Sequence, residues 1–459
     1  MYKKRDGQIG IEDFGQVMGV KLSPDNRWVK KAERIPWEEI EERYAALFRS
    51  TCGNVAKPSQ MALGALLIQD ERKISDEETV MQIMETPALQ YFCGMSRYEE
   101  KMPFDPSLMV HFRRRLTKEI LCEINELIIQ KAEGDHKDDD DNQNSGTLIV
   151  DATCAPQYIK YPQDIELLNE AREKTEEIID KLQGQIGGEK PRTYRKKARK
   201  EYLKTIRKRR KTVKEIRLGI GRQLGYLGRN LGHIERYRQQ GLTADTQLLE
   251  TIAKLYEQQL LMHQNRIHSV PNRIVSLSQP YVRPIVRGKA KAPVEFGAKL
   301  DISVTGGFAR LEYVSYEAYN EAENLQQIIE RYYRREGRYP ARVLADKIYR
   351  NRSNLAYCKD RGIRLSGPAL GRPKKDAVRD KQQEYADICD RVEVERSYST
   401  AKRSHGLGLI RTRLYDTSLS VISLAILAMN IAKIFCAHFW AALLCLLFPV
   451  ERLKLVLVQ

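Results

Sequence analysis

The sequence has few of the residues that build disulfide-bonded or zinc-binding proteins. Its 459 residues include eight cysteines and seven histidines, and both are scattered along the chain. Neither a C-x-x-C pair nor an H-E-x-x-H motif occurs, which excludes the commonest zinc-site patterns. A secretory signal peptide is also missing from the N-terminal residues, so we expect reduced thiols in a cytoplasmic protein.

An uninterrupted transmembrane segment is lacking as well. A helix that spans a bilayer needs about 20 consecutive apolar residues, whereas the uncharged run from Ile434 to Phe448 has 15. The apolar stretch before it is interrupted by serines and by Lys433. We therefore predict a buried core helix from Thr417 to about Ile434, capped by Asp416, and a second apolar helix after it. A membrane anchor is the less favoured alternative.

What the chain has in excess is positive charge. It carries 78 Lys and Arg against 61 Asp and Glu, a formal net charge of +17. Between Arg192 and Arg222 there are 15 basic residues and only two acids. Such a concentration predicts a polyanionic partner, and double-stranded DNA is the partner we favour over a merely solvated surface.

Residues 165–268 show apolar positions three and four apart, which predicts long amphipathic helices packed as a coiled-coil-like hairpin or small bundle. Glycines between 219 and 228 are expected to break the middle helix. The basic side of these helices would face outward and follow DNA phosphates. The cations expected to do so are Arg207, Lys208, Arg209, Arg210 and Lys211, and the basic loop that follows adds Arg283 and Arg287.

Residues 36–133 predict a compact bundle of short helices. Ser75 is the expected N-cap of one helix, and Asp105-Pro106 begins another. Arg113 and Arg114 lie near the end of this bundle. They fit either a DNA-contacting helix of a helix-turn-helix-like module or a solvated basic face, and the residues alone leave the two about even.

Three acids follow patterns that would bring them together in the fold. Asp151 ends the β-like run T-L-I-V, Asp346 ends R-V-L-A, and Glu395 lies on a predicted late helix. Clustered carboxylates repel one another unless divalent cations lie between them, so the hypothesis is a site for two Mg²⁺ ions, with Mn²⁺ as an alternative. Asp346 also fits a helix N-cap, and Glu395 also fits a surface acid paired with Arg391.

The late helix has the spacing R-x3-E-x6-K. Positions four, three and four apart share one helix face, so the helix would present Arg391, Glu395, Tyr398 and Lys402 together. One carboxylate flanked by cations and a ring suits work on nucleic-acid phosphate. Glu393 is the obvious substitute for Glu395, but two residues away it faces another direction.

The order of predicted elements indicates an α/β fold. Strand, hairpin, helix, strand, helix, strand and helix describe a mixed sheet with helices on its faces, and the hairpin turns at Gly306-Gly307. The helices of residues 165–268 are then an insertion between the first and second core strands.

These motifs resemble those of bacterial insertion-sequence DDE transposases, the IS-five-like branch and its relatives. The resemblance rests on R-x3-E-x6-K, on D-K-I-Y-R after the second aspartate, and on V-D-A-T-C-A-P, E-F-G-A-K and G-I-R-L-S-G-P. It covers nearly the whole chain, although Ile388 stands where the family pattern usually has tyrosine. It implies an RNase H-like core whose metal ligands are Asp151, Asp346 and Glu395.

The resemblance further implies Mg-dependent DNA cleavage and strand transfer of the cut-and-paste type. The partners would be terminal inverted repeats and target DNA, with Tyr349, Arg391 and Lys402 near the cut. By analogy the protein would form a homodimer in the synaptic complex, associate with the nucleoid and have no membrane partner. A metal-dependent nuclease without strand transfer and a non-catalytic, architectural DNA-binding protein are the competing hypotheses.

The predicted parts of the chain are a flexible N-terminal segment (1–35), a helical DNA-end-binding domain (36–133), an acidic linker (134–146), an RNase H-like core (147–164 and 269–436), a basic helical insertion (165–268) and an apolar tail (437–459).

Overall fold

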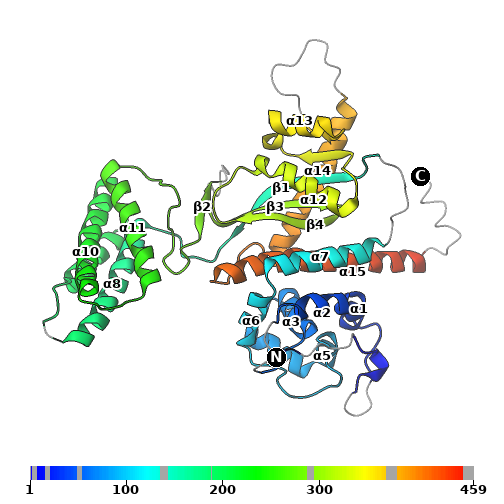
Figure 1. Ribbon diagram of the computed structural model, residues 1–459, viewed down its shortest axis with the longest axis horizontal. Coiled ribbons are helices and arrows are strands. Elements are labelled where there is room, and N and C mark those ends of the chain that lie inside the picture. The colour runs from blue at the N-terminus through cyan, green and yellow to red at the C-terminus, as the bar shows by residue number, and fades with distance from the viewer. Residues whose placement is uncertain are drawn as a thin grey trace, which may run out of the picture. The chain divides into compact units, whose positions relative to one another are not determined.

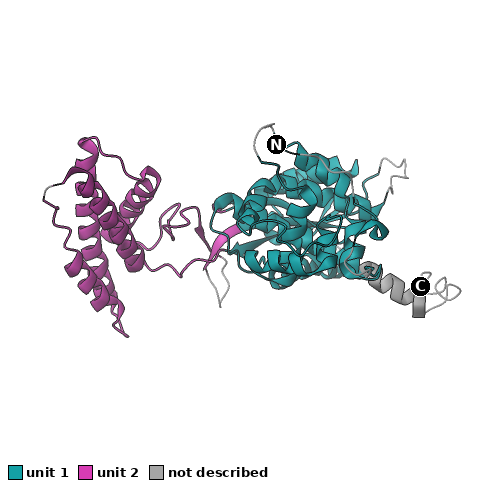
Figure 2. Cartoon of the chain, turned by 90° about the horizontal axis from the view of Figure 1, so that it is seen from below, with its two compact units in different colours: residues 1–156, 299–315, 319–459 teal, residues 157–298, 316–318 magenta. Residues whose placement is uncertain are grey.

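The computed structural model describes residues 2, 8–15, 21–48, 54–134, 143–187, 189–286, 294–367 and 380–447, the last eleven of them by backbone only. The chain divides into two compact units (Figure 2). The sheet unit comprises residues 1–156, 299–315 and 319–459, and the helical unit comprises residues 157–298 and 316–318. Most of the predicted acidic linker, Arg287 and most of the loop after Gly367 lie outside the described residues.

The described residues form a mixed six-stranded sheet (Figure 1) in the order β2-β3-β1-β5-β6, with β4 paired to β3. The strands are β1 (Thr147–Pro156), β2 (Arg283–Val286), β3 (Val294–Thr305), β4 (Phe308–Ser315), β5 (Arg342–Ala345) and β6 (Arg364–Leu365). β3 and β4 are antiparallel and turn at Gly306-Gly307, where both glycines have positive φ. The predicted hairpin is confirmed, and its turn uses backbone angles that glycine adopts without strain.

Two neighbouring strands of this sheet run parallel and in register. β1 pairs with β5 so that Val150 lies opposite Ala345. The next residue in each segment is an aspartate: Asp151, in the middle of β1, and Asp346, which directly follows β5. Paired strands lie about 4.8 Å apart. The register therefore places the two acids side by side.

Helices of the sheet unit connect and cover these strands (Figure 1). They are the 3-10 helices η3 (Glu321–Glu323) and η4 (Lys347–Tyr349), and the α-helices α12 (Leu325–Glu336), α13 (Arg352–Asp360) and α14 (Lys381–Ser404). α14 packs against both β1 and β5. It thereby carries Glu395 to the edge where the two aspartates lie.

The N-terminal part is a bundle of short helices. They are α1 (Arg27–Arg34), α2 (Trp37–Ala45), α3 (Ser59–Arg72), α4 (Asp76–Glu85), α5 (Pro87–Phe92), α6 (Leu108–Arg115) and α7 (Lys118–Glu133) after a 3-10 turn, η1 (Ile11–Asp13). Ser75 caps α4 as predicted, because its hydroxyl accepts the Glu78 N–H at 3.1 Å. The prediction of a flexible segment up to residue 35 is wrong for α1, since Trp28 and Val29 are buried in the core.

A single long helix, α15 (Tyr415–Leu447), replaces the two predicted C-terminal helices. No proline or glycine occurs in its sequence, so nothing ends the helix near residue 434. Asp416 lies in the first turn instead of capping it. By length and composition α15 could cross a membrane. Ile422 and Leu427 are nevertheless fully buried inside the protein, which is the behaviour of a core helix.

α15 joins the N-terminal helices to the sheet. Its apolar residues share one core cluster with those of α1, α3 and α5. Asn430 donates to Asn125 Oδ1 on α7 at 2.8 Å and to the Ala309 carbonyl on β4 at 2.7 Å. Arg310 pairs with Glu126 at 2.8 Å. The predicted N-terminal domain is thus packed against the sheet within one unit.

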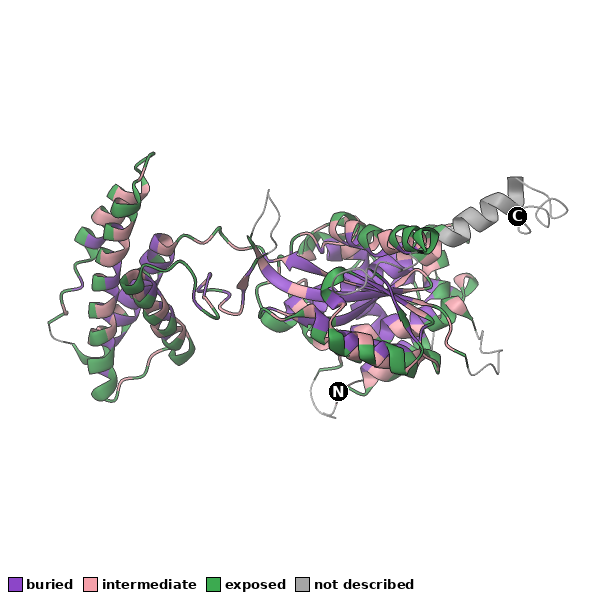
Figure 3. Ribbon diagram, turned by 90° about the horizontal axis from the view of Figure 1, so that it is seen from above, coloured by how far each residue is buried: buried purple, intermediate pink, exposed green. Residues whose placement is uncertain are grey.

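The described part of the helical unit has four long helices, which lie between β1 and β2 in chain order. They are α8 (Asp164–Ile186), α9 (Arg195–Ile206), α10 (Val213–Gln239) and α11 (Thr246–Asn265). The unit extends to residue 298, beyond the predicted boundary at 268. Two apolar clusters hold α8, α10 and α11 together, and Figure 3 shows the buried residues on their facing sides.

The glycines of α10 do not break the helix, contrary to prediction. α10 is continuous over 27 residues. A Cβ on Gly219 would lie 2.9 Å from Ile165 Cδ1 of α8 and 3.0 Å from Thr205 Cγ2 of α9. Glycine at this position therefore permits close packing of helices, which outweighs its low helix propensity.

Candidate active site

The three predicted acids converge around one arginine of α14. Asp346 Oδ1 lies 3.2 Å from a guanidinium nitrogen of Arg391, and Glu395 Oε1 lies 4.0 Å from another. The side chains of Asp346 and Glu395 are 55% and 58% exposed, so both can be reached from solvent. Arg391 therefore joins the end of β5 to the helix face that carries Glu395.

Asp151 is the more enclosed member of the group. Burial raises its pKa to about 6. The Ala152 N–H, which its Oδ1 accepts at 2.8 Å, and nearby Arg391 lower the pKa, while Asp346 and Glu321 raise it. Arg391 and Asp346 both influence the pKa of Asp151, so the three residues lie near one another.

Both alternative interpretations of the acids describe real contacts. Asp346 is the N-cap of η4, because its Oδ1 accepts the Lys347 N–H at 2.8 Å. Glu395 is an exposed acid four residues from Arg391. These contacts are compatible with the proposed site, because the same two carboxylates also lie beside Arg391.

Glu393, the possible substitute for Glu395, points elsewhere. Its carboxylate lies 3.4 Å from Lys433 Nζ on α15 and close to Gly307 of the hairpin turn. Two residues apart on a helix, the two glutamates serve different faces. Of these two glutamates, Glu395 is therefore the one that lies beside Arg391.

The structure shows a further carboxyl group near the three acids, which the sequence analysis did not identify. Asp301 on β3 is fully buried and accepts hydrogen bonds from Tyr319 Oη at 2.8 Å and Asn324 Nδ2 at 2.6 Å. Burial raises its pKa to about 6. An acid inside the apolar strand run A-K-L-D-I-S-V was the available indication.

Two predicted DNA contacts are corrected by burial. Tyr349 is fully buried and Tyr398 is 9% exposed. Their hydroxyls have no hydrogen-bond partner among the described residues, and both rings lie near enough to Asp151 and Asp301 to feel the charges of these acids. The ring of Tyr398 shares a helix face with Glu395 as predicted, but that part of the face packs against the sheet.

The donor chemistry of the site fits a hard divalent cation, because every predicted ligand is a carboxylate. The spacing fits less well. Within the described ranges no three acidic, histidine or cysteine side chains lie close enough to share one ion. Arg391 is the cation between Asp346 and Glu395 in this arrangement.

The predicted basic contacts separate into structural and exposed residues. Arg113 is buried, pairs with Asp76 and donates to Gln69 Oε1 at 2.7 Å, so it holds α6 to α3 and α4 rather than facing DNA. Arg114 is exposed. Arg283 is half-buried and donates to the Val282 carbonyl at 3.2 Å.

The basic run 207–211 lies between α9 and α10, not on a helix as predicted. Four of its five side chains are exposed, and Lys208 pairs with Glu215 in the first turn of α10. The run is therefore an exposed, charged connection between two helices.

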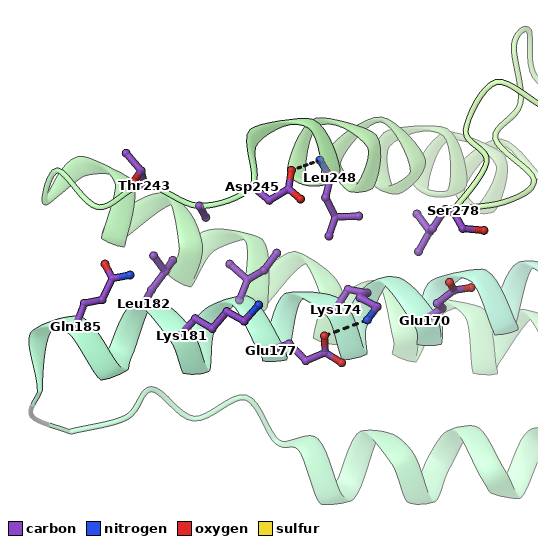
Figure 4. A pocket seen from close by; sticks show the side chains of 13 residues that line it. Glu170, Lys174, Glu177, Lys181, Leu182, Gln185, Thr243, Asp245, Leu248 and Ser278 are labelled. Carbon is purple, nitrogen blue, oxygen red and sulfur yellow. Dashed lines mark hydrogen bonds and ion pairs between the residues drawn. The ribbon is translucent and has the colours of Figure 1, made fainter. Parts of the chain in front are cut away.

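The helical unit has a surface cleft of about 530 Å³ between α8 and the start of α11 (Figure 4). Two lysines and three acids line it, a net charge of 2 − 3 = −1. Lys174 pairs with Glu177 at 3.0 Å, and Asp245 caps α11 through the Leu248 N–H. A cleft without excess positive charge is not suited to DNA phosphate.

Acids that follow the paired residues of two adjacent parallel strands, together with a strongly basic chain, fit a protein that acts on nucleic acid. Comparison with known families agrees. Residues 343–432 match the transposase DDE domain, and residues 17–115 match a transposase domain designated DUF772. Over these two segments the chain is similar to DDE transposases.

One curated relative is 27% identical over 154 residues, which covers 32% of this chain and 69% of the relative. It is an uncharacterized protein, ORF8 in the nfe locus of Rhizobium meliloti. No solved structure matches the chain.

Proposed function

We propose that this chain binds the terminal inverted repeats of an insertion sequence and catalyses metal-dependent DNA cleavage and strand transfer of the cut-and-paste type. The observation that carries the proposal is the meeting of Asp346 and Glu395 at Arg391, beside Asp151. These acids come from two adjacent strands and one helix, and their order along the chain is that of an RNase H-like core.

Asp151, Asp346 and Glu395 would hold Mg²⁺ or Mn²⁺, which supplies positive charge to the reacting phosphate and lowers the pKa of bound water. The residues of the chain do the positioning. The Lys347 N–H fixes the direction of the Asp346 carboxylate. Arg391 is placed to exchange these carboxylates for a DNA phosphate, since guanidinium groups bind both in the same bidentate manner.

The raised pKa of Asp151 supports a ligand role. A half-enclosed carboxyl group beside other acids is destabilised as an anion, and an added cation relieves that cost. Synapsis of two DNA ends calls for two copies of the chain, so we propose a homodimer that acts in the cytoplasm on nucleoid DNA.

Asp151→Asn tests the proposal against a non-catalytic DNA-binding protein. The substrate is a duplex containing the DNA that flanks the reading frame, with Mg²⁺, Mn²⁺ or EDTA. We expect cleavage to fall by on the order of a thousand-fold while binding in EDTA is retained. Glu393→Gln is the matched control and should cleave like the unmodified protein. Undiminished cleavage by Asp151→Asn would contradict the proposed site.

A nuclease without strand transfer would share this site. Joining of the cut 3′ end to a second duplex separates the two functions. Joined products are expected, and cleavage without any joining would leave the nuclease as the correct description.

A further inference from the structure

The sheet unit also contains a cleft that is separate from the three acids. It has a volume of about 930 Å³ and lies between the α3–α4 turn, α6 and the segment that follows α14. Its lining includes Lys73, Lys402, Arg411 and Arg413. Residues 406–414 of this wall carry none of the predicted functional residues.

The acids that line the cleft are already paired. Asp70 lies 2.8 Å from both Lys73 Nζ and His405 Nδ1, and Asp76 pairs with Arg113. Arg411 and Arg413 are exposed, and neither forms an ion pair within the part of the chain that the structure describes. The cleft therefore presents positive charge without a counter-charge from these residues.

The wall of the cleft is held in place at both ends. The Leu407 N–H bonds to the Ala401 carbonyl of α14 at 3.1 Å, and the Ile410 N–H bonds to the Pro156 carbonyl of β1 at 2.8 Å. A Cβ on Gly408 would lie 2.7 Å from the Lys402 carbonyl oxygen, so the turn requires glycine. Arg411 and Arg413 thus project from a fixed segment.

The cleft begins on the helix that carries Glu395. Lys402 follows Glu395 by seven residues, so the two share a helix face and lie about 10 Å apart along the axis. The duplex rises 3.4 Å for each base pair along a strand, and 10 Å corresponds to about three base pairs. A DNA strand that followed α14 from the acids would therefore bring a phosphate about three base pairs away to Lys402, where the cleft begins.

We infer that this cleft is the binding site for the DNA backbone about three base pairs from the cut, with Arg411 and Arg413 as its phosphate contacts. The inference rests on the proposed function. It identifies an arginine pair outside the R-x3-E-x6-K spacing, and it gives the packing of the N-terminal helices against the core a purpose, because the two together form the cleft.

The test compares the double variant Arg411→Gln/Arg413→Gln with the control Arg334→Gln/Lys359→Gln, which removes two exposed cations of α12 and α13. Binding of the flanking-DNA duplex is measured by fluorescence anisotropy in EDTA over a range of salt concentrations. Each lost phosphate contact reduces the slope of log K against log salt by about 0.9. We expect the cleft variant to be shallower by about 1.8 and the control to be unchanged.

Circular dichroism must first show that the variant is folded. If the variant is misfolded, ethylation interference on the unmodified protein replaces it and should identify phosphates about three base pairs from the cut. An unchanged slope in a folded variant that still cleaves overturns the cleft inference and leaves the proposed function intact. A shift in sedimentation without a change in slope overturns it in favour of a subunit interface. No DNA binding by the unmodified protein would overturn both.

Discussion

At the scale of single residues, the site combines exposed and buried acids. Asp346 and Glu395 are open to solvent and share Arg391, whereas Asp301 is fully enclosed and bonded to Tyr319 and Asn324. Enclosed carboxyl groups disfavour their charged form. Burial of Asp301 therefore makes the stability of the folded protein depend on pH.

The raised pKa of Asp301 predicts the direction in which the stability of the folded protein changes with pH. Its folded pKa of about 6 exceeds the ordinary value of 3.8, so the folded state holds a proton that the unfolded state has lost between about pH 4 and 6. Its stabilising contribution is present below pH 4 and is lost as the pH rises through 6. Asp301→Asn should flatten this decline by about 1–3 kcal/mol. Urea denaturation at several pH values measures it, and an unaltered pH dependence would contradict the prediction.

At the scale of elements, α15 and α10 show how local sequence serves packing. α15 crosses from the N-terminal helices to the sheet, and Asn430 is its polar contact with both. α10 keeps several glycines in a continuous helix because some of them face neighbouring helices closely.

Asn430→Ala should destabilise the sheet unit by about 2–4 kcal/mol. The change leaves the buried Ala309 N–H without its acceptor and Asn125 Oδ1 without its donor, and buried unsatisfied groups are costly. Ser420→Ala is the control, since this buried hydroxyl bonds to the Asp416 carbonyl of its own helix at 3.0 Å. It should cost less than about 1 kcal/mol. Chemical denaturation compares the two, and equal losses would contradict the bridging role of Asn430.

Substitution of glycine by alanine should change the stability of the helical unit differently at two positions of α10. A Cβ on Gly225 would meet no atom of the described residues within 4 Å, so Gly225→Ala should stabilise the helical unit by about 1 kcal/mol through helix propensity. Gly219→Ala gains the same propensity but meets Ile165 and Thr205, and should be neutral or destabilising. Thermal unfolding followed by circular dichroism decides, and equal stabilisation by both would show that the contact is unimportant.

At the scale of the whole molecule, the net charge of +17 is distributed unevenly. The basic run 207–211 and the cleft of the sheet unit are exposed positive features, whereas the cleft of the helical unit has no excess of positive charge. Binding of DNA is therefore expected to depend on salt through a limited number of residues.

Neutralising the run Arg207–Lys211 to glutamine should weaken duplex binding and make the salt slope shallower, by at most about 4.5 for five lost contacts. Arg236→Gln/Arg238→Gln removes two exposed cations at the other end of α10 and is the control. Anisotropy titrations with a duplex at several salt concentrations measure both slopes. A slope that the five changes do not alter would exclude this connection as a DNA contact.

The sequence by itself predicted the hairpin and most of the strands, although Arg283–Val286, expected in a basic loop, forms β2 and β1 continues past Asp151 to Pro156. It also singled out the three acids of the proposed site. Short β-branched runs, paired glycines and the R-x3-E-x6-K spacing are local patterns. They can be read from the sequence because they depend only on residues close together in the chain. The family resemblance followed from the same residues.

Only the tertiary structure decided which residues are reachable. Tyr349, Tyr398 and Arg113 are of residue types that commonly contact DNA, but they are buried. Asp301 and the arginines 411 and 413 were not recognised because their neighbours come from distant segments. Burial and charge balance arise from contacts between elements far apart in the chain, so no local pattern could show them.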